Sequence, residues 1–171
     1  MIRDATTADA PACAAIYAPY VTDTVISFET EAPDTTEVAR RITAAHAWLV
    51  LEDDDHIAGY AYATPFAARA AYRWSCETSI YLERGRRRTG AGRVLYEELF
   101  ERLRERGFHR AFAGMTLPNE ASAGLHRALG FEPAGVYRRV GWKHGAWHDV
   151  AWVQHDLNAT EGCTSAPREL T

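Results

Sequence analysis

The sequence predicts a mixed α/β fold in which helices flank one twisted β-sheet. Segments whose apolar residues recur with helical spacing are interspersed with shorter segments in which apolar residues alternate or β-branched residues dominate. No segment repeats along the chain. With 171 residues, of which 47% are hydrophobic, the chain is long enough to bury one core, so we expect a single domain. Such an interspersed order of strands and helices is typical of a mixed sheet.

The expected elements follow one another along the chain in a definite order. Strands are expected at residues 2–5, 48–51, 57–63, 74–82, 108–116, 136–142 and 147–157. One helix is expected after Thr6 and Asp9, with Tyr17 and Tyr20 on its inner face, and others are expected over residues 35–47, 91–106 and 120–129. Residues 24–29 suit either a strand or an extended loop, because they are rich in β-branched and aromatic side chains.

Capping and helix-breaking residues set the expected helix ends. Thr6 and Asp9 resemble a capping box before the first helix, and Pro19 limits how far that helix can run. Thr35, or the threonine after it, can cap the second helix. In the third helix leucines recur every fourth residue, and Gly107 can end it.

Two turns and one alternating run define the expected strands. Residues 74–82 alternate, so Glu77 lies in mid-strand on the face opposite Cys76. An acidic turn, Asp53 to Asp55 followed by His56, joins two strands in a hairpin, and it lacks the ligand spacing of a calcium loop. A second hairpin, rich in tryptophan, turns at residues 144–146.

Composition and charge narrow the class of protein. A net charge of -4 and a pI near 6.0 argue against a general nucleic-acid binder, which needs a clustered basic excess. The scattered cysteines Cys13, Cys76 and Cys163 indicate free thiols in a reducing compartment. No leader-like or membrane-spanning apolar run is present, so we expect a cytoplasmic protein without a membrane partner. Residues 158–171 are polar and predict a mobile tail after a domain over residues 1–157.

A basic, glycine-rich segment precedes the third helix and has the properties of a phosphate cradle. Residues 86–93 read Arg-Arg-Arg-Thr-Gly-Ala-Gly-Arg. Gly90 and Gly92 allow left-handed backbone and a close approach to a ligand, and the helix start adds amide donors and partial positive charge. A solvated turn between strand and helix is the alternative.

These features together resemble the GNAT superfamily of acyl-CoA N-acyltransferases. Arg87-Arg88-Thr89-Gly90-Ala91-Gly92 fits the Q/R-x-x-G-x-G/A loop of that superfamily, and the last helix ends in its Leu-Gly-Phe sequence. Within the superfamily, the chain is most similar to the phosphinothricin and methionine sulfoximine acetyltransferases. The segments that carry this likeness are residues 27–31, 72–74, 77–81, 117–119 and 143–149. The resemblance extends over residues 2–157.

The resemblance implies acetyl-CoA as co-substrate and a set of coenzyme-binding residues. Backbone amides of the cradle would hold the pyrophosphate, and the main chain of the preceding strand would pair with the pantetheine arm. The implied residues are Ile80, Tyr81, Leu82, Arg87, Arg88, Thr89, Gly90, Ala91, Gly92, Arg93 and Asn119. Asn119 is equally well explained as a helix cap. No metal is expected, because thioester aminolysis needs none, and we interpret His144, His148 and Asp149 as a structural turn.

The resemblance also implies two catalytic residues. Glu77 matches the glutamate that removes a proton from the substrate ammonium, so that a neutral amine can attack the thioester. Partial burial of such a carboxylate raises its pKa toward neutrality. His126 occupies a position where many relatives carry a tyrosine, and it either donates a proton to coenzyme A or binds the acidic group of the substrate. A packed helix histidine is the alternative. Tyr96 has the spacing of a core residue.

The implied substrate is a small amino acid, and the implied activity is transfer of an acetyl group to its α-amino group. Phe28, Arg69 and Tyr72 match positions that line the amino-acid pocket. Ala67 stands where phosphinothricin-specific members can carry a lysine, which leaves the charge of the pocket open. The chain is thus expected to be a detoxifying N-acetyltransferase and a homodimer. There are two alternatives: acetylation of another small amine or of a protein N-terminus, and acyl-CoA sensing without turnover.

Overall fold

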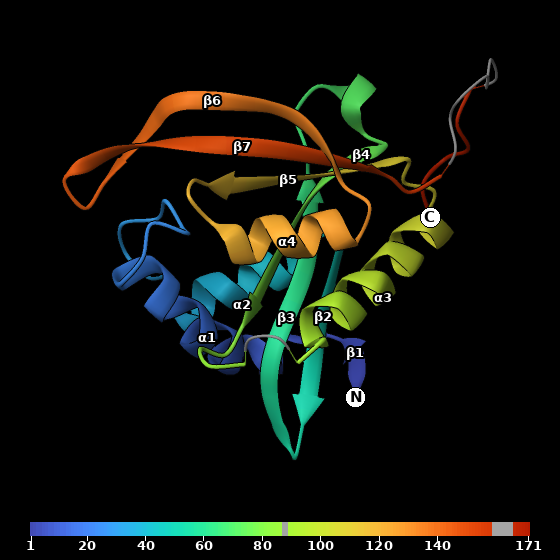
Figure 1. Cartoon of the computed structure of the whole chain (residues 1–171). Coiled ribbons are helices and arrows are strands. Elements are labelled where there is room, and N and C mark those ends of the chain that lie inside the picture. The colour runs from blue at the N-terminus through green and yellow to red at the C-terminus, as the bar shows by residue number, and fades with distance from the viewer. Residues whose placement is uncertain (87–88, 159–165) are drawn as a thin grey trace.

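The computed structural model describes residues 1–86, 89–158 and 166–171, and it contains a seven-stranded sheet flanked by helices (Figure 1). The strands are β1 (Ile2–Asp4), β2 (Ala47–Asp53), β3 (His56–Pro65), β4 (Ser75–Leu82), β5 (Arg110–Thr116), β6 (Glu132–Lys143) and β7 (Ala146–Asp156). The helices are α1 (Ala10–Thr22), α2 (Thr35–Ala44), α3 (Ala91–Arg106) and α4 (Glu120–Ala128), with single 3-10 turns η1 (Thr7–Asp9) and η2 (Ala70–Tyr72). The predicted mixed α/β class and the order of the elements are confirmed.

The sheet is antiparallel on both sides of one parallel pair. Its strand order is β1-β2-β3-β4-β5-β7-β6. Among the described strands, only β4 and β5 pair in parallel, because α3 connects them and returns the chain to the same end of the sheet. The long hairpin of β6 and β7 reaches past the rest of the sheet, over the end of α1 (Figure 1).

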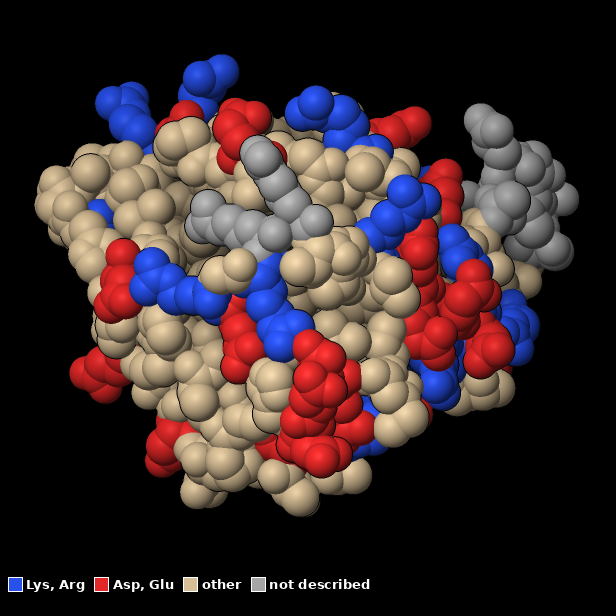
Figure 2. Space-filling view, turned by 60° about the horizontal axis from the view of Figure 1, so that its bottom comes forward, with Lys and Arg blue, Asp and Glu red and all other residues tan. Residues whose placement is uncertain are grey.

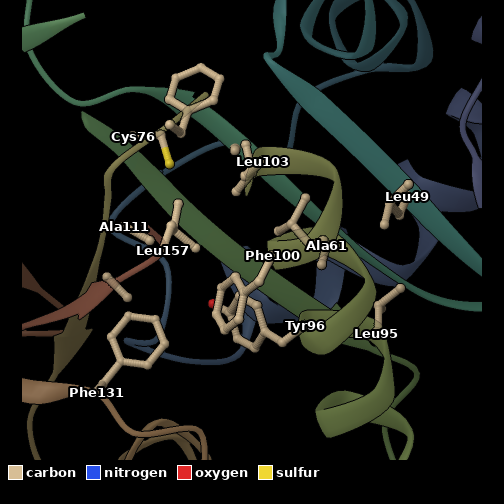
Figure 3. Packing of buried hydrophobic residues seen from close by; sticks show 14 residues of the cluster. Leu49, Ala61, Cys76, Leu95, Tyr96, Phe100, Leu103, Ala111, Phe131 and Leu157 are labelled. Carbon is tan, nitrogen blue, oxygen red and sulfur yellow. The ribbon is translucent and has the colours of Figure 1, made fainter. Parts of the chain in front are cut away.

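Two hydrophobic clusters cover the two faces of the sheet. Leu49 of β2 packs with α3, whereas its neighbours Trp48 and Val50 pack with α1 and α2, as the period of two in a strand requires. Figure 3 shows the first cluster, in which Phe100 and Tyr96 of α3 lie close together above the strands. The two clusters hold the helices against the two faces of the sheet, and this close packing makes the central strands a rigid support for the site.

Several predicted helix boundaries are wrong, for local reasons. α1 continues past Pro19 to Thr22, because the backbone N–H of Asp23 still finds the carbonyl of Pro19 at 3.1 Å. The cap of α2 is Asp34, whose side chain accepts a hydrogen bond from the N–H of Glu37 at 2.8 Å. That helix ends at Ala44 because the chain turns there into β2.

The predicted bounds of the last strands and of one loop also change. β6 begins at Glu132 instead of residue 136, and it absorbs Pro133 and Gly135 through an irregularity in its register with β7. Residues 24–29 form a loop and no strand, which settles the alternative that the sequence left open. The capping interaction of Thr6 and Asp9 is confirmed, since the carboxylate accepts from the N–H of Thr6 at 2.7 Å.

The end of the chain lies against the C-terminus of α3. The guanidinium of Arg168 donates to the carbonyl of Arg104 at 3.2 Å and also to that of Glu105, and Leu170 packs against the first cluster. Trp74 donates its indole N–H to the carbonyl of Arg168 at 2.9 Å. Residues 166–171 therefore have defined contacts, while the mobility expected for the tail stays a prediction.

Two of the predicted free thiols lie within the described residues. Cys13 and Cys76 are both free and buried, and burial raises the pKa of each thiol to about 12. Cys163 lies outside the described residues. None of the helices in the described ranges is long and apolar enough to cross a membrane.

Candidate active site

A cleft opens where β4 and β5 separate. The two strands pair only from Ser75 to Glu77 on β4, opposite residues 110–112 of β5. Beyond these rows β5 continues to pair with β7 on its other edge, while its distance from β4 grows. The cleft holds about 390 Å³ of open space. Its lining residues are Ile26, Thr78, Ser79, Ile80, Tyr81, Tyr96, Ala113, Gly114, Met115, Thr116, Asn119, Ser122 and His126.

Glu77 lies on the last paired row of β4 and β5, directly before the lining residue Thr78, and is not itself part of the lining. Its neighbours in the sheet are Thr64 of β3 and Phe112 of β5. The side chain is partly buried, and it has no hydrogen bond or ion pair with any residue that the structure describes. Burial therefore raises the pKa of the Glu77 carboxyl above its ordinary value. A partly buried carboxylate without a cationic partner has the properties of a proton acceptor.

His126, Tyr96 and Ser122 form a hydrogen-bonded group on the other side of the cleft. The Nδ1 atom of His126 lies 2.8 Å from the carbonyl oxygen of Ser122, so that nitrogen carries a proton and donates it. Nε2 lies 3.3 Å from the hydroxyl of Tyr96 and accepts from it. Burial lowers the pKa of His126 and raises that of Tyr96, so both side chains are neutral at physiological pH.

Tyr96 belongs to the core, as predicted, but its hydroxyl also reaches the cleft. The side chain is fully buried, and its ring stacks on Phe100 with centroids 5.3 Å apart. Helical spacing on α3 predicts that the ring points inward. It does not reveal that the hydroxyl meets His126, which α4 supplies from thirty positions further along the chain. Ser122 and Ile26 are likewise cleft residues that sequence reasoning missed, and neither has a local sequence signal.

The glycine-rich turn places an open helix terminus at the cleft. Gly90 has left-handed backbone, with φ of 81°, and leads directly into α3. Gly92 is buried, and a Cβ on it would lie 3.4 Å from Leu125 and 3.6 Å from Ile80, so the backbone there approaches its neighbours closely. The first amide groups of a helix have no acceptor within that helix and suit an anion. The predicted cradle residues Arg87 and Arg88 lie outside the described residues.

The described arginines next to the cradle are engaged in ion pairs. Arg86 contacts Asp53 at 2.5 Å and Glu83 at 3.1 Å, and Arg93 contacts Glu97 at 2.7 Å. Figure 2 shows this face of the molecule, on which basic and acidic side chains are intermixed. Anion binding by the described part of the turn therefore depends on backbone amides more than on free guanidinium groups.

The remaining predicted coenzyme residues lie at different depths around the cleft. Ile80, Tyr81 and Asn119 line it, and the side chain of Asn119 also caps α4 by accepting from the N–H of Ser122 at 3.1 Å. Leu82 does not line it, and its carbonyl accepts a hydrogen bond from the Tyr20 hydroxyl at 2.7 Å. The other two predicted residues, Thr89 and Ala91, lie at the start of α3. The hydroxyl of Thr89 lies 3.4 Å from the amide nitrogen of Ala91.

The predicted substrate residues lie outside the lining of the cleft. Phe28 belongs to the loop between α1 and α2, next to Ile26, which does line it. Arg69 directly precedes η2 and is exposed, with no acidic partner among the residues described. Tyr72 ends η2 and packs edge-on against Phe66, with ring centroids 5.7 Å apart. These residues come from two separate segments, and no direct contact joins the two.

Comparison with known proteins identifies the family of the chain. A family profile described as "Acetyltransferase (GNAT) domain" matches residues 2–152. A phosphinothricin N-acetyltransferase of Streptomyces viridochromogenes is 39% identical over 160 residues, which cover 91% of this chain and 87% of the relative. An L-methionine sulfoximine/L-methionine sulfone acetyltransferase of Pseudomonas aeruginosa is 35% identical over 174 residues, which cover 97% of this chain and 98% of the relative.

A solved structure extends the likeness to three dimensions. It is a GNAT superfamily phosphinothricin acetyltransferase from Sinorhizobium meliloti in complex with acetyl-CoA, with a TM-score of 0.91 and 37% sequence identity. The superposition covers 99% of this chain and 93% of that one. The chain therefore belongs to the GNAT family of acetyltransferases.

Proposed function

We propose that the protein transfers an acetyl group from acetyl-CoA to the α-amino group of phosphinothricin-like or methionine sulfoximine-like amino acids. The observation that carries this proposal is the cleft that opens between β4 and β5 just beyond Glu77, with the start of α3 close to Ile80 of its lining. The relatives named above act on these two kinds of amino acid. Acetylation removes the positive charge of the α-amino group, which fits a detoxifying role.

The residues around the cleft fit coenzyme A as the acetyl carrier. Gly90 has left-handed backbone, and a Cβ on it would meet nothing within 4 Å, so this part of the start of α3 is open to a pyrophosphate. The edge of β4 beyond Glu77 is no longer paired with β5, so the main chain of Ile80, which points away from β3, would hydrogen-bond an extended pantetheine arm, whereas the N–H and C=O of Tyr81 face β3. When bound, the coenzyme supplies an activated acetyl thioester.

Glu77 is assigned the role of proton acceptor. The α-ammonium group of the substrate must lose a proton before its nitrogen can attack, and the raised pKa of Glu77 suits that task. No carboxylate is among the described residues that line the cleft, and Glu77 directly precedes the lining residue Thr78 on β4. The alternation of β4 points Cys76 to the opposite face, where it is buried, so we assign no covalent enzyme intermediate.

Tyr96 and His126 are assigned together as the proton-donating pair. The neutral ring of His126 holds its one proton at Nδ1, so its Nε2 accepts the single proton of the Tyr96 hydroxyl in the resting structure. The hydroxyl would have to rotate away from Nε2 toward the cleft before it could give that proton to a leaving sulfur. A proton at Tyr96 Oη would neutralise the sulfur that leaves the acetyl group.

The α-amino acid is expected to lie on the side of the cleft that faces α1 and α2. Arg69 offers a planar fork of donors for a carboxylate or a phosphinate, and it has no competing acidic partner among the described residues. Phe28 and Tyr72 would provide apolar contacts to the side chain of the substrate.

We also propose a homodimer that forms through the hairpin of β6 and β7. Five large apolar side chains on this hairpin are about half exposed: Val136 (47%), Tyr137 (60%), Val140 (52%), Trp142 (58%) and Trp147 (57%). An apolar surface of this kind is typical of a protein interface. Size-exclusion chromatography with light scattering tests the proposal, and a monomer mass over a wide concentration range would contradict it.

A panel of amines tests the proposed function. Release of the coenzyme A thiol would be measured with acetyl-CoA and phosphinothricin, methionine sulfoximine, methionine sulfone, glutamate, a polyamine or an aminoglycoside. We expect turnover with the first three. Turnover restricted to the polyamine, the aminoglycoside or a peptide N-terminus would replace the substrate class. Binding of acetyl-CoA without turnover of any amine would favour an acyl-CoA sensor and contradict the proposed function.

A further inference from the structure

The chain contains a single lysine, and that lysine is buried. Of the 19 basic residues that are lysine or arginine, only Lys143 at the end of β6 is a lysine. It is 8% exposed, and its ammonium donates to the carbonyl of Val21 at 2.6 Å and to that of Ser27 at 2.7 Å. Val21 lies in the last turn of α1, where carbonyl groups lack partners within the helix and attract a cation.

The hairpin around Lys143 forms a seat for the loop between α1 and α2. A Cβ on Gly141 would overlap the ring of Phe28, so the bare glycine gives that ring its place. His148 lies on the paired strand, with its ring centroid 6.3 Å from that of Phe28, and its Nε2 lies 2.9 Å from the carbonyl of Lys143. Figure 1 shows the hairpin reaching over this part of the chain.

The opposite side of the same loop is held by a second set of polar contacts. The hydroxyl of Tyr17 lies 2.7 Å from that of Ser27 and donates to Glu29 at 3.0 Å. Arg41 of α2 holds the Glu29 carboxylate at 2.6 and 3.1 Å. The loop is thus fixed between the helices and the hairpin, and it carries Ile26 into the lining of the cleft.

We propose that Lys143 and Gly141 are positioning residues for amine binding. By holding the carbonyl of Ser27 and the ring of Phe28, they set where Ile26 and Phe28 meet the substrate. Neither residue touches the cradle, so coenzyme binding does not depend on them. This inference rests on the proposed function, because it assigns the two residues a role in that reaction. Lys143 begins residues 143–149, one of the segments that carry the family likeness, and Gly141 lies in the strand just before it.

Steady-state kinetics of Lys143→Met and Gly141→Ala test the inference. A loop that is displaced by about an ångström should raise the KM for phosphinothricin roughly tenfold or more, while the KM for acetyl-CoA changes by less than about twofold. Arg40→Gln serves as the matched control. It removes a cation from α2 whose side chain is 67% exposed, and it should leave the KM for the amine and the KM for acetyl-CoA unchanged. Equal effects on both KM values, or none, would overturn the inference.

The wild-type protein separates this inference from the function on which it rests. If the wild type turns over none of the amines, the proposed function fails. If the wild type is active and Lys143→Met keeps the wild-type KM for the amine, only the inference fails. A labelling measurement covers the case in which the variants do not fold. An amine-reactive acetate ester modifies the lysine and the N-terminal amine, and because the chain has one lysine, the internal peptide that contains it reports on Lys143 alone in mass spectrometry.

Labelling of Lys143 requires the loop to leave the hairpin, which exposes the ammonium group. If amine binding needs the seated loop, phosphinothricin at ten times its Kd, without acetyl-CoA, should slow the labelling about tenfold. Labelling at an unchanged rate would overturn the inference. Acetyl-CoA alone should have little effect, because it does not contact the loop in the proposed arrangement.

Discussion

Replacing Glu77 by glutamine removes the proposed proton acceptor and keeps the size of the side chain. The position belongs to the last row in which β4 pairs with β5, so backbone pairing holds the variant side chain in the same place. Glutamine cannot accept a proton from the substrate ammonium. The variant should therefore still bind and orient both substrates, and it should lose only the part of the rate acceleration that comes from acid–base catalysis.

The size of the loss follows from the surroundings of Glu77. None of the described residues lining the cleft is an aspartate or a glutamate, so no second carboxylate is placed to take over. General-base catalysis is worth roughly 10² to 10⁴ in rate, which corresponds to about 3 to 5 kcal/mol of transition-state stabilisation. We expect kcat/KM of Glu77→Gln to fall within that range.

The fold of the variant should be at least as stable as the wild type at neutral pH. Burial raises the pKa of Glu77 in the folded protein, so the folded state binds more protons than the unfolded state between the two pKa values. The free energy of unfolding contributed by this group therefore decreases as the pH rises through that window. Glutamine carries no such penalty, and lost activity in the variant cannot be ascribed to unfolding.

The assay is release of the coenzyme A thiol as a function of pH, with acetyl-CoA binding followed by calorimetry. For the wild type, kcat/KM should rise with pH as Glu77 ionises, and this limb should be missing in the variant. The Kd for acetyl-CoA should be unchanged. A variant that keeps more than about a tenth of the wild-type kcat/KM would refute the assignment, because that loss is smaller than a general base provides.

Three further predictions concern the cleft and the fold. Tyr96→Phe keeps the packed ring but removes the hydroxyl that contacts His126, so kcat should fall roughly 10²-fold in the same assay. Gly90→Ala places a side chain at φ of 81°, and urea denaturation should show a loss of about 1 to 2 kcal/mol. The Arg3 guanidinium lowers the pKa of Asp9 from 3.8 to about 2, so the stability from this contact should be lost as the pH falls through that interval. Asp9→Asn should abolish this part of the pH dependence of the urea midpoint.

Much of the fold could be predicted because local signals and the fold agree. The bounds of α3 are those expected, since Gly90 and Gly107 mark its ends with left-handed backbone and leucines line its inner face. Predictions failed where tertiary contacts override a local signal. Pro19 stays inside α1, and Pro133 stays inside β6 at an irregular position that a strand pattern does not anticipate.

The candidate site could be predicted from the sequence only in part. Period-two alternation and a family motif indicate the same residue, Glu77, and the structure places it on the last row in which β4 pairs with β5. The role of Tyr96 could not be found, since its partner His126 comes from another helix. The contacts of Lys143 are still harder to predict from the sequence. Its partners are backbone carbonyls 116 and 122 positions away, and a carbonyl gives no residue-type signal in the sequence.

The central claim is that this chain acetylates the free α-amino group of a phosphinothricin-like amino acid directly. The most direct test measures coenzyme A thiol release with phosphinothricin and with N-acetylphosphinothricin, and identifies the product by mass spectrometry. We expect thiol release in step with a product that carries one added acetyl group, and no release with the blocked analogue. Equal release with both compounds, or release without an acetylated amino acid, would contradict the claim.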